Sequence, residues 1–217
     1  MILLCGGEKG GTGKSTIATN LAAMRLKESA DVLLLDTDPQ ASSSYWSSIR
    51  DEDETLQRVS CVQKFGKGLE KELYALSEKY DDLIIDAGGR DSAELRASML
   101  AADMILIPVM PGQFDVWTLD RIERLISEAG NINAEFDALV VINRAAPNPQ
   151  IKEAAELQEL LDEFENLTLA ETVIRDRIAY RRAVREGKSV LEMKPQDGKA
   201  AAEMTNLYEE VFNVKVE

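Results

Sequence analysis

The sequence predicts an α/β protein whose doubly wound, mostly parallel sheet is flanked by helices. Short runs of continuous apolar residues alternate with amphipathic helical patterns, as expected for strands buried on both faces of a parallel sheet. A glycine-rich stretch follows the first run, and two later runs end in aspartate. The apolar runs are residues 1–5, 31–36, 82–86, 104–109 and 136–142.

Length and composition favour one layered domain over residues 1–217. The chain is 45% hydrophobic and 29% charged, and it has no run of ~18 apolar residues that could span a membrane. Residues 1–5 lack a basic leader, so we expect no signal peptide. Cys5 and Cys61 are too few for a disulfide framework, which fits the cytoplasm. Without histidine, a zinc site or a His-based catalytic dyad is not expected.

The formal net charge of −14 argues against a protein that coats nucleic acid with its whole surface. Any contact with nucleic acid must come from a local basic patch.

Residues 8–16 read E-K-G-G-T-G-K-S-T and lie between the first apolar run and a helical pattern at 17–27. Glycines allow successive N–H groups to point at one anion, and the helix adds the positive end of its dipole. Lys14 can then reach the β- and γ-phosphates, and the Ser15 hydroxyl can ligate Mg²⁺. The residues expected to bind nucleotide here are Gly10, Gly11, Thr12, Gly13, Lys14, Ser15 and Thr16.

The match to G-x-x-x-x-G-K-[ST] is incomplete because Glu8 stands at the first glycine. Instead, the K-G-G-T-G-K-S segment at 9–15 resembles the deviant Walker A loop of the ParA/MinD family of ATPases. The resemblance implies a P-loop NTPase fold and a second catalytic lysine, Lys9, beside Lys14. The alternative is a glycine-rich turn with two solvated lysines.

Asp36 and Asp38 follow the strand at 31–36 and should emerge beside the glycine loop, because parallel sheets place ligands at their carboxyl ends. Such carboxylates can hold metal-bound water and orient an attacking water. The segment D-x-D-P-Q resembles the A′ motif of ParA proteins, which implies that Asp38 positions the lytic water and Asp36 lies near Mg²⁺. The alternative is a turn that opens the helix predicted at 42–50.

Asp86 ends the next acidic strand and is the candidate for the Walker B role of holding Mg²⁺ through water. With Ser15 and Asp36 it completes the expected metal set. Gly88 and Gly89 follow, and their N–H groups could sense the γ-phosphate in a switch-like manner. They could equally serve only to turn the chain.

Further elements are predicted along the rest of the chain, with a strand at 59–62 and helices at 69–80 and 151–164. Residues 110–117 resemble a segment that borders the nucleotide and dimer interface in ParA relatives, although Trp117 is expected in the core. In those relatives an asparagine after the strand at 136–142 reads the adenine edge, which implies that role for Asn143.

Residues 175–188 form the one basic island, in which a helix would align four cations at i, i+4, i+8 and i+11. Like charges at this spacing oppose helix formation, so the stripe needs a reason. We expect a sequence-independent grip on DNA phosphates, and the surrounding pattern resembles the C-terminal part of ParA proteins. The alternative is that the arginines pair with acids elsewhere. The expected DNA-binding residues are Arg177, Arg181, Arg182, Arg185 and Lys188.

The last helical pattern, 200–212, has one apolar face, and its polar face carries Glu203, Glu209 and Glu210. MinD proteins end in a basic amphipathic helix that docks on anionic lipid, whereas this acidic face would be repelled. We therefore expect the helix to pack on the domain, with no membrane contact.

Taken together, the resemblance implies a Mg²⁺-dependent ATPase that converts ATP and water to ADP and phosphate and acts as a switch in the cytoplasm, on the nucleoid. Two ATP-bound copies would pack face to face, with Lys9 of each reaching the partner's phosphates. This homodimer would bind DNA non-specifically and would be released when a ParB-like or ribbon-helix-helix centromere-binding protein stimulates hydrolysis. The expected role is plasmid or chromosome partition.

Four alternatives keep a similar fold. The same switch could position a carboxysome or chemoreceptor cluster on the nucleoid, or act as a membrane-bound division regulator. An electron-transfer iron protein would need cysteines bridging a cluster across the dimer, but Cys5 and Cys61 are predicted inside strands. The last alternative is a metabolic ligase or a tyrosine kinase. The kinase would need a tyrosine-rich tail, whereas Tyr208 is the one tyrosine in that part of the sequence.

Overall fold

The computed structural model describes residues 1–28, 30–111, 116–130, 136–147, 153–161 and 163–213, without the side chains of 116–119 and 153–156. The strands are β1 (Ile2–Cys5), β2 (Val32–Asp36), β3 (Ser60–Gln63), β4 (Asp82–Asp86), β5 (Met104–Val109), β6 (Asp137–Ala145) and β7 (Thr168–Arg175). The helices are α1 (Lys14–Lys27), α2 (Ser42–Arg50), α3 (Leu69–Ser77), α4 (Ala93–Ala101), α5 (Val116–Gly130), α6 (Glu153–Leu161), α7 (Ile178–Arg185) and α8 (Gly198–Phe212).

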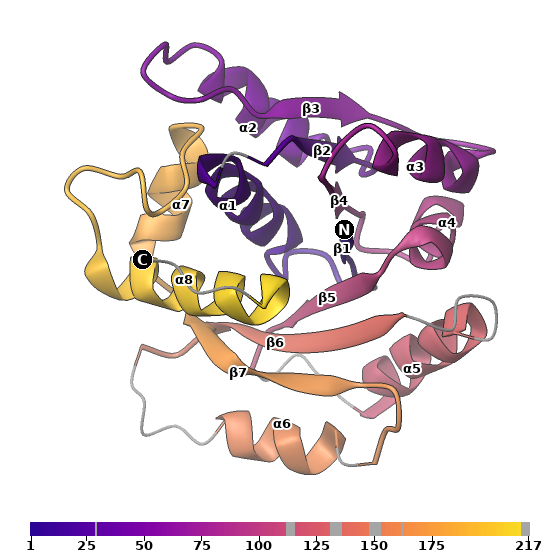
Figure 1. Cartoon of the computed structure of the whole chain (residues 1–217). Coiled ribbons are helices and arrows are strands. Elements are labelled where there is room, and N and C mark those ends of the chain that lie inside the picture. The colour runs from indigo at the N-terminus through magenta and orange to yellow at the C-terminus, as the bar shows by residue number, and fades with distance from the viewer. Residues whose placement is uncertain (29, 112–115, 131–135, 148–152, 162, 214–217) are drawn as a thin grey trace.

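The described strands form one seven-stranded sheet in the order β3-β2-β4-β1-β5-β6-β7 (Figure 1). Every pair of neighbouring strands is parallel. The predicted fold class is therefore confirmed, and the sheet is wholly parallel within the described chain. Strands β2, β3 and β4 lie on one side of β1, and β5, β6 and β7 lie on the other. The strand order therefore changes direction at β1, and doubly wound folds bind their ligands at such a point.

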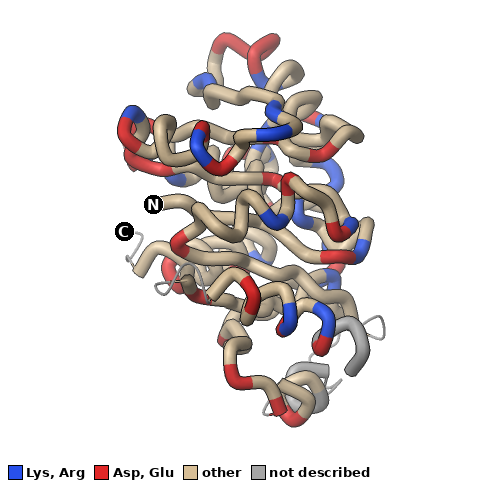
Figure 2. The backbone as a smooth tube through the Cα atoms, turned by 90° about the vertical axis from the view of Figure 1, so that its right-hand side faces the viewer, with Lys and Arg blue, Asp and Glu red and all other residues tan. Residues whose placement is uncertain are grey.

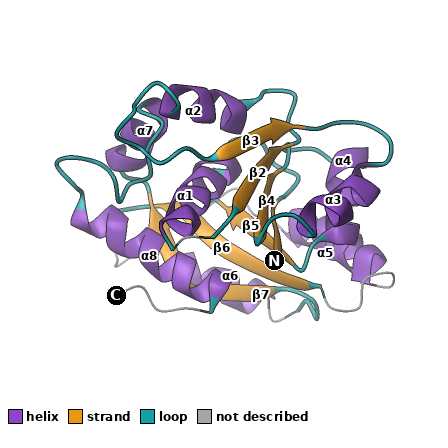
Figure 3. Ribbon diagram, turned by 45° about the horizontal axis from the view of Figure 1, so that its top comes forward, coloured by secondary structure: helices purple, strands orange, loops and turns teal. Residues whose placement is uncertain are grey.

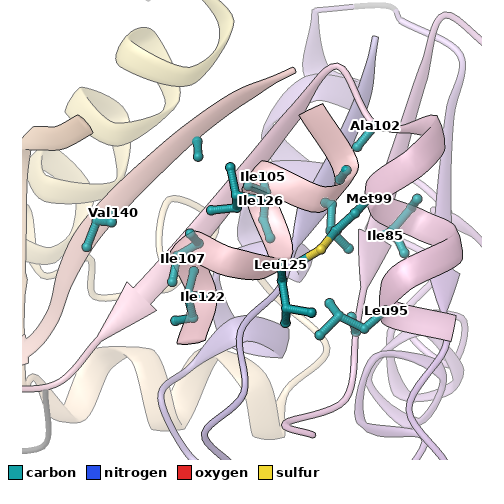
Figure 4. Close-up of a cluster of buried hydrophobic side chains, with 14 of the residues drawn as sticks. Ile85, Leu95, Met99, Ala102, Ile105, Ile107, Ile122, Leu125, Ile126 and Val140 are labelled. Atoms are coloured by element: carbon teal, nitrogen blue, oxygen red, sulfur yellow. The ribbon is translucent and has the colours of Figure 1, made fainter. Parts of the chain in front are cut away.

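Two helical layers cover the sheet (Figure 3). Side chains of α1, α2, α7 and α8 pack on one face, and those of α3 to α6 pack on the other. Figure 4 shows the second cluster, in which Met99 and Leu95 of α4 and Ile122 and Leu125 of α5 meet the central strands. Continuous apolar strands are thus explained by burial on both faces.

Three elements escaped the sequence prediction, namely β7, α4 and α5. Strand β7 is an edge strand with alternating burial, and its residues 168–175 carry four polar side chains that mask the pattern. Helix α4 has a weak amphipathic pattern because alanine and serine fill much of it. The predicted helix at 151–164 corresponds to α6, and residues 151, 152 and 162 lie outside the described chain.

The basic helix predicted over 175–188 is shorter than expected. Residues up to Arg175 belong to β7, and α7 ends at Arg185. Gly187 then turns the chain with φ of 63°. Arg177 is the N-cap residue of α7, and Lys188 lies beyond the turn, so the regular stripe of four helical cations does not form.

Helix α8 packs on the domain, as predicted. Met204, Leu207 and Tyr208 are fully buried. Its acidic face does more than meet solvent, because the Glu210 carboxylate accepts from the N–H groups of Glu171 and Thr172 at 2.6 and 3.2 Å. These bonds occupy part of the free edge of β7, which would otherwise be open to pairing with another strand.

No helix in the described part of the chain is long and apolar enough to cross a membrane. Acidic and basic positions are interspersed along the tube rather than divided between two halves (Figure 2). A net charge of −14 is therefore compatible with basic patches at particular places on the surface.

The turn after α7 is pressed against α2. A Cβ on Gly187 would lie 2.4 Å from the Arg50 backbone nitrogen, a distance that real Cβ atoms do not show. Arg50 is buried, donates to the Gly187 carbonyl at 3.0 Å and pairs with Glu192 at 2.8 Å. Only glycine fits this close backbone contact.

We expect Gly187→Ala to lower the free energy of unfolding by about 2–5 kcal/mol, combining left-handed strain with overpacking. Gly66→Ala is the matched control, because Gly66 also has positive φ (91°) but has open space around its Cα. It should cost only about 1–2 kcal/mol. Urea denaturation measures both, and equal losses would show that the contact with α2 is unimportant.

Candidate nucleotide-binding site

The glycine-rich loop joins β1 to α1 at the centre of the sheet edge, as predicted. Gly11 and Gly13 adopt φ of 75° and 97°. Gly13 is also the N-cap residue of α1, whose first turn begins at Lys14. The helix N-terminus therefore faces the loop, where its free N–H groups and dipole favour an anion.

Lys14 is largely buried, and its ammonium donates to the Lys9 carbonyl at 2.8 Å. Burial lowers the Lys14 pKa, while the carboxylates of Asp86 and Asp38 oppose that shift. A buried ammonium next to two acids is poised to exchange its backbone partner for phosphate oxygens.

A cavity of about 410 Å³ opens beside this loop. Among the residues that line it are Gly10, Gly11, Gly13, Lys14, Ser15, Thr16, Asp38, Gln40, Trp46 and Gly89. It thus brings together the predicted phosphate-binding residues and the carboxylate predicted to position water.

Asp36 is fully buried, and both its oxygens accept backbone N–H groups. Oδ1 accepts from Asp38 at 3.1 Å, and Oδ2 accepts from Ser44 at 2.8 Å. The side chain therefore shapes the loop and caps the first turn of α2, because the α2 N-cap residue Ala41 makes no side-chain bond. The turn interpretation of this motif is correct in part, and it does not exclude a place near the metal.

Asp86 is also buried, and it differs from Asp36 in its hydrogen bonds. Its Oδ2 accepts from the Ser43 hydroxyl at 2.6 Å, whereas Oδ1 has no hydrogen-bond partner among the described residues. Burial raises the Asp86 pKa to about 7, while hydrogen bonds from the Ser43 and Ser15 hydroxyls oppose that rise. A buried carboxylate oxygen without a partner calls for a cation or its water.

The donor set fits Mg²⁺, which prefers oxygen and is usually held by one or two carboxylates together with substrate phosphates. Ser15 and Asp86 supply such oxygens, with Asp36 beside them. No group of three or more Asp, Glu, Cys or His side chains that could hold a metal unaided occurs in the described chain.

The segment after β4 closes on the loop. A Cβ on Gly89 would lie 2.6 Å from the Gly10 nitrogen, and a Cβ on Gly88 would lie 3.5 Å from Asp38 Cγ. Glycine is therefore required at 89 by this close contact, whereas a Cβ on Gly88 would make only an ordinary van der Waals contact. The backbone of the two glycines lies where a change in the phosphate loop would displace it.

Glu8, which occupies the first glycine position of the usual motif, is held by α5. Its carboxylate is 2.8 Å from Arg121 Nε, and only 10% of the side chain is exposed. Burial raises the Glu8 pKa, and Arg121 counteracts this rise. Glu8 thus anchors the start of the loop next to Lys9.

Asn143 lies against the loop from β6. Its Nδ2 donates to the Thr12 carbonyl at 2.6 Å, and its Oδ1 accepts from the Arg144 N–H at 2.9 Å. It borders a second cavity of about 180 Å³, which shares Gly11, Gly13 and Thr16 with the first and also includes Asp176, Tyr180 and Arg181. The adenine-reading role of Asn143 stays a prediction, and most of the predicted interface segment, 112–115 and the Trp117 side chain, lies outside the described residues.

Sequence reasoning missed two residues at this edge. Ser43 contacts Asp86, but a serine inside S-S-S gives no signal of its own. Arg144 has φ of 56°, a strained value for this residue, and its guanidinium donates to the Gly11 carbonyl at 3.3 Å. Only its place next to Asn143 could have pointed to it.

The predicted DNA-binding residues divide into two groups. Arg177 is paired with Glu203 by hydrogen bonds of 3.1 and 3.0 Å from its Nε, and Lys188 is paired with Glu186 and Asp53. The exposed group consists of Arg181, Arg182 and Arg185 on α7. Within the described chain, Arg181 lies 3.4 Å from Asp176, while Arg182 and Arg185 make no ion pair. Arg177 and Lys188 thus pair with acidic residues of the same chain, as the alternative interpretation expected.

Several known proteins are similar to this chain over most of its length. Maintenance of carboxysome distribution protein A from Halothiobacillus neapolitanus is 29% identical over 205 residues, covering 94% of this chain and 93% of that protein. The protein of the same name from Gloeobacter kilaueensis is 31% identical over 195 residues, covering 89% and 85%. Protein ParA from Rhizobium radiobacter is 25% identical over 210 residues, covering 94% and 91%.

Solved structures share the fold. The ATP complex of Cyanothece McdA(D38A) has a TM-score of 0.75 at 19% identity, covering 100% of this chain and 97% of that one. MinD of Pyrococcus horikoshii complexed with Mg-ADP has a TM-score of 0.70 at 18% identity, covering 99% of both.

The model of the CobQ/CobB/MinD/ParA nucleotide binding domain matches residues 3–190, a span that includes the loop, both acidic strand ends and Asn143. The resemblance inferred from the motifs is confirmed, and the chain belongs to this family of nucleotide-binding domains.

Proposed function

We propose that this protein is a Mg²⁺-dependent ATPase that dimerises on ATP, binds DNA without sequence preference and positions a cargo on the nucleoid. The observation that carries the proposal is the single cavity lined by Lys14, Ser15, Asp38 and Gly89. A phosphate cradle and a water-positioning carboxylate are parts that phosphoryl transfer to water needs, and the Gly89 backbone beside them would sense the γ-phosphate.

In this proposal, Lys14 and the loop N–H groups hold the β- and γ-phosphates. Ser15 and Asp86 would hold a magnesium ion, which would neutralise phosphate charge, and Asp36 keeps the adjoining turn in place. Asp38 orients the attacking water. Because Gly88 and Gly89 lie on Asp38 and on the loop, loss of the γ-phosphate changes the packing of this segment.

The loop tip explains why the active form would be a dimer. Gly10 and Gly11 are exposed on the surface, whereas Lys14 is buried behind them. Lys9 adjoins this exposed tip, and its carbonyl is held by Lys14. We propose that the Lys9 side chain serves the nucleotide of a second copy, because Lys14 already serves the nucleotide of its own chain.

The proposed DNA-binding surface contains fewer residues than the sequence predicts. Arg181, Arg182 and Arg185 are the exposed cations of α7, and of these Arg181 lies 3.4 Å from Asp176, while Arg177 and Lys188 would have to break ion pairs with Glu203 and Glu186 first. Three phosphate contacts per protomer give weak, salt-sensitive binding, and a dimer doubles them. Dimerisation on ATP would therefore control retention on DNA.

Two kinds of cargo are compatible with the proposed ATPase switch. Partition of a plasmid or chromosome, with a ParB-like or ribbon-helix-helix partner, is favoured by the ParA likeness. Positioning of a protein complex is favoured by two relatives named for carboxysome distribution, at 29% and 31% identity. Deletion of the gene would separate them, because plasmid or chromosome loss indicates partition and a clustered protein complex indicates positioning.

A membrane-bound role is disfavoured by α8, whose apolar face is buried in the domain and whose outer residues are acidic. Flotation of the ATP-bound protein with anionic liposomes tests this directly. If the protein floats with the liposomes, the proposed surface on which the switch acts is a lipid membrane and not DNA.

We expect Lys14→Ala to weaken ATP binding by about 100-fold or more, because charge-assisted bonds to phosphate contribute about 1.5–3 kcal/mol each. Isothermal titration calorimetry measures this affinity. Lys27→Ala, at the other end of α1, is the control and should bind as the wild type does. Unchanged affinity in Lys14→Ala would show that the loop does not hold the phosphates.

We expect Asp38→Ala to slow ATP hydrolysis by about 100-fold or more while keeping ATP binding, since a positioned acid or base contributes that much. The ATP-bound dimer should then accumulate, which light scattering after gel filtration detects. Asp137→Ala changes a carboxylate at the opposite end of the strands and should hydrolyse ATP normally. Wild-type turnover in Asp38→Ala would remove Asp38 from the mechanism.

We expect reversal of Arg181 and Arg182 to glutamate to abolish DNA retention while leaving ATP-dependent dimerisation intact. Removing two phosphate contacts per protomer should also lower the salt dependence of any remaining binding, by about 2 in log–log slope. Reversal of Lys67 and Lys71, exposed residues in and before α3, makes the same charge change elsewhere. If both double variants lose DNA equally, net charge and not α7 controls binding.

A further inference from the structure

Helix α2 begins at the acidic strand ends of the nucleotide site. The Ser43 hydroxyl donates to Asp86 Oδ2 at 2.6 Å, and the Ser44 N–H donates to Asp36 Oδ2 at 2.8 Å. The first turn of the helix is therefore bonded to two of the carboxylates expected at the metal. Ser43 is fully buried, so its bond to Asp86 does not compete with solvent.

The junction before α2 is strained. Ala41 has φ of 56° and ψ of 34°, a left-handed conformation that alanine rarely adopts. It connects the Asp38 turn to the helix, and the Ala41 N–H is bonded to the Asp38 carbonyl at 2.9 Å. Strain of this kind persists only where surrounding contacts impose it, and it is characteristic of functional junctions.

The other end of α2 is bonded to the segment after α7. Trp46 Nε1 donates to the Lys188 carbonyl at 3.2 Å. Arg50 donates to the Gly187 carbonyl at 3.0 Å and to both Glu192 oxygens at 2.9 and 2.8 Å. The turn after α7 also packs closely on α2, because a Cβ on Gly187 would lie 2.4 Å from the Arg50 backbone nitrogen.

One short helix thus connects two surfaces with different chemistry. Over its nine residues, about 14 Å at 1.5 Å per residue, it runs from Asp86 to the turn that ends α7. Val184 of α7 lines the nucleotide cavity together with Trp46, so the two helices also meet beside the site. Arg181, Arg182 and Arg185 of α7 are exposed, and Arg181 also borders the second cavity beside the phosphate loop.

We propose that α2 couples the nucleotide site to the arginine face of α7, and that Ser43 is the positioning residue at which this coupling begins. The inference rests on the proposed function only in assigning DNA to that face. A shift of the Asp86 carboxylate moves the Ser43 hydroxyl bonded to it. Because α2 is a single rigid turn-to-turn unit, the shift reaches Gly187 and reorients α7.

Hydrogen exchange of the full-length protein, with and without Mg²⁺ and a non-hydrolysable ATP analogue, tests the coupling without DNA. In the wild type, the nucleotide should change amide protection in the phosphate loop and also in 178–192. In Ser43→Ala, the loop should still respond, whereas the response of 178–192 should be lost. Ser43→Thr keeps the hydroxyl and should restore the response.

Ser48→Ala is the matched control, because Ser48 lies on the exposed side of α2 and bonds only to the Tyr45 carbonyl. It should behave as the wild type does. Trp46→Phe tests the same coupling from the other end by removing the bond to Lys188, and it should also lose the response of 178–192. This second variant keeps the test decisive if Ser43→Ala does not fold.

The coupling is overturned if 178–192 responds normally in Ser43→Ala and Trp46→Phe, or if it does not respond in the wild type. DNA retention is then measured separately by gel shift. A Ser43-dependent response of α7 in a protein that does not bind DNA would uphold the coupling and reject the proposed function. If the protein binds DNA but 178–192 shows no such response, the proposed DNA binding is upheld and the coupling is rejected.

Discussion

The rest of the structure depends on one constraint, the close packing of the phosphate loop against the backbone after β4 and against a side chain of β6. A Cβ on Gly13 would lie 2.1 Å from Asn143 Nδ2, and a Cβ on Gly89 would lie 2.6 Å from the Gly10 nitrogen. The phosphate loop is therefore clamped between the ends of β4 and β6. Because β1 lies between β4 and β5, this clamp can form only at the centre of the sheet.

Charge follows from the same arrangement. The clamp buries Lys14 close to Asp86 and Asp38, so a cation and two anions share a site with restricted access to water. A triphosphate and magnesium would add charges of both signs, which match the unpartnered oxygen of Asp86 and the ammonium of Lys14. The acids that give the chain its charge of −14 are used partly in this way and partly to bind arginines inside the fold.

Most of the fold could be predicted because continuous apolar strands, glycines and terminal aspartates are local signals. The positions of Asp86 and Lys14 could be predicted from their neighbours in the sequence, an apolar run before Asp86 and glycines before Lys14. Ser43 could not be predicted, because its role depends on α2 packing across the end of β4, a contact between residues 43 apart in the chain. The edge strand β7 was missed for a related reason, since backbone N–H groups on its free edge bond to carboxylates of α8 that lie 28 to 39 residues away.

Glu203 shows why a count of arginines overstates a DNA surface. Its carboxylate accepts from Arg177, from the Tyr180 hydroxyl and from the Arg175 N–H, so it ties α7 and the end of β7 to α8. Breaking one partner away would leave a partly buried charge uncompensated, which costs more than an exposed phosphate contact returns. Arg177 is therefore better explained as the anchor that fixes α7 on the domain, and a fixed helix is what allows Arg181, Arg182 and Arg185 to act as one surface.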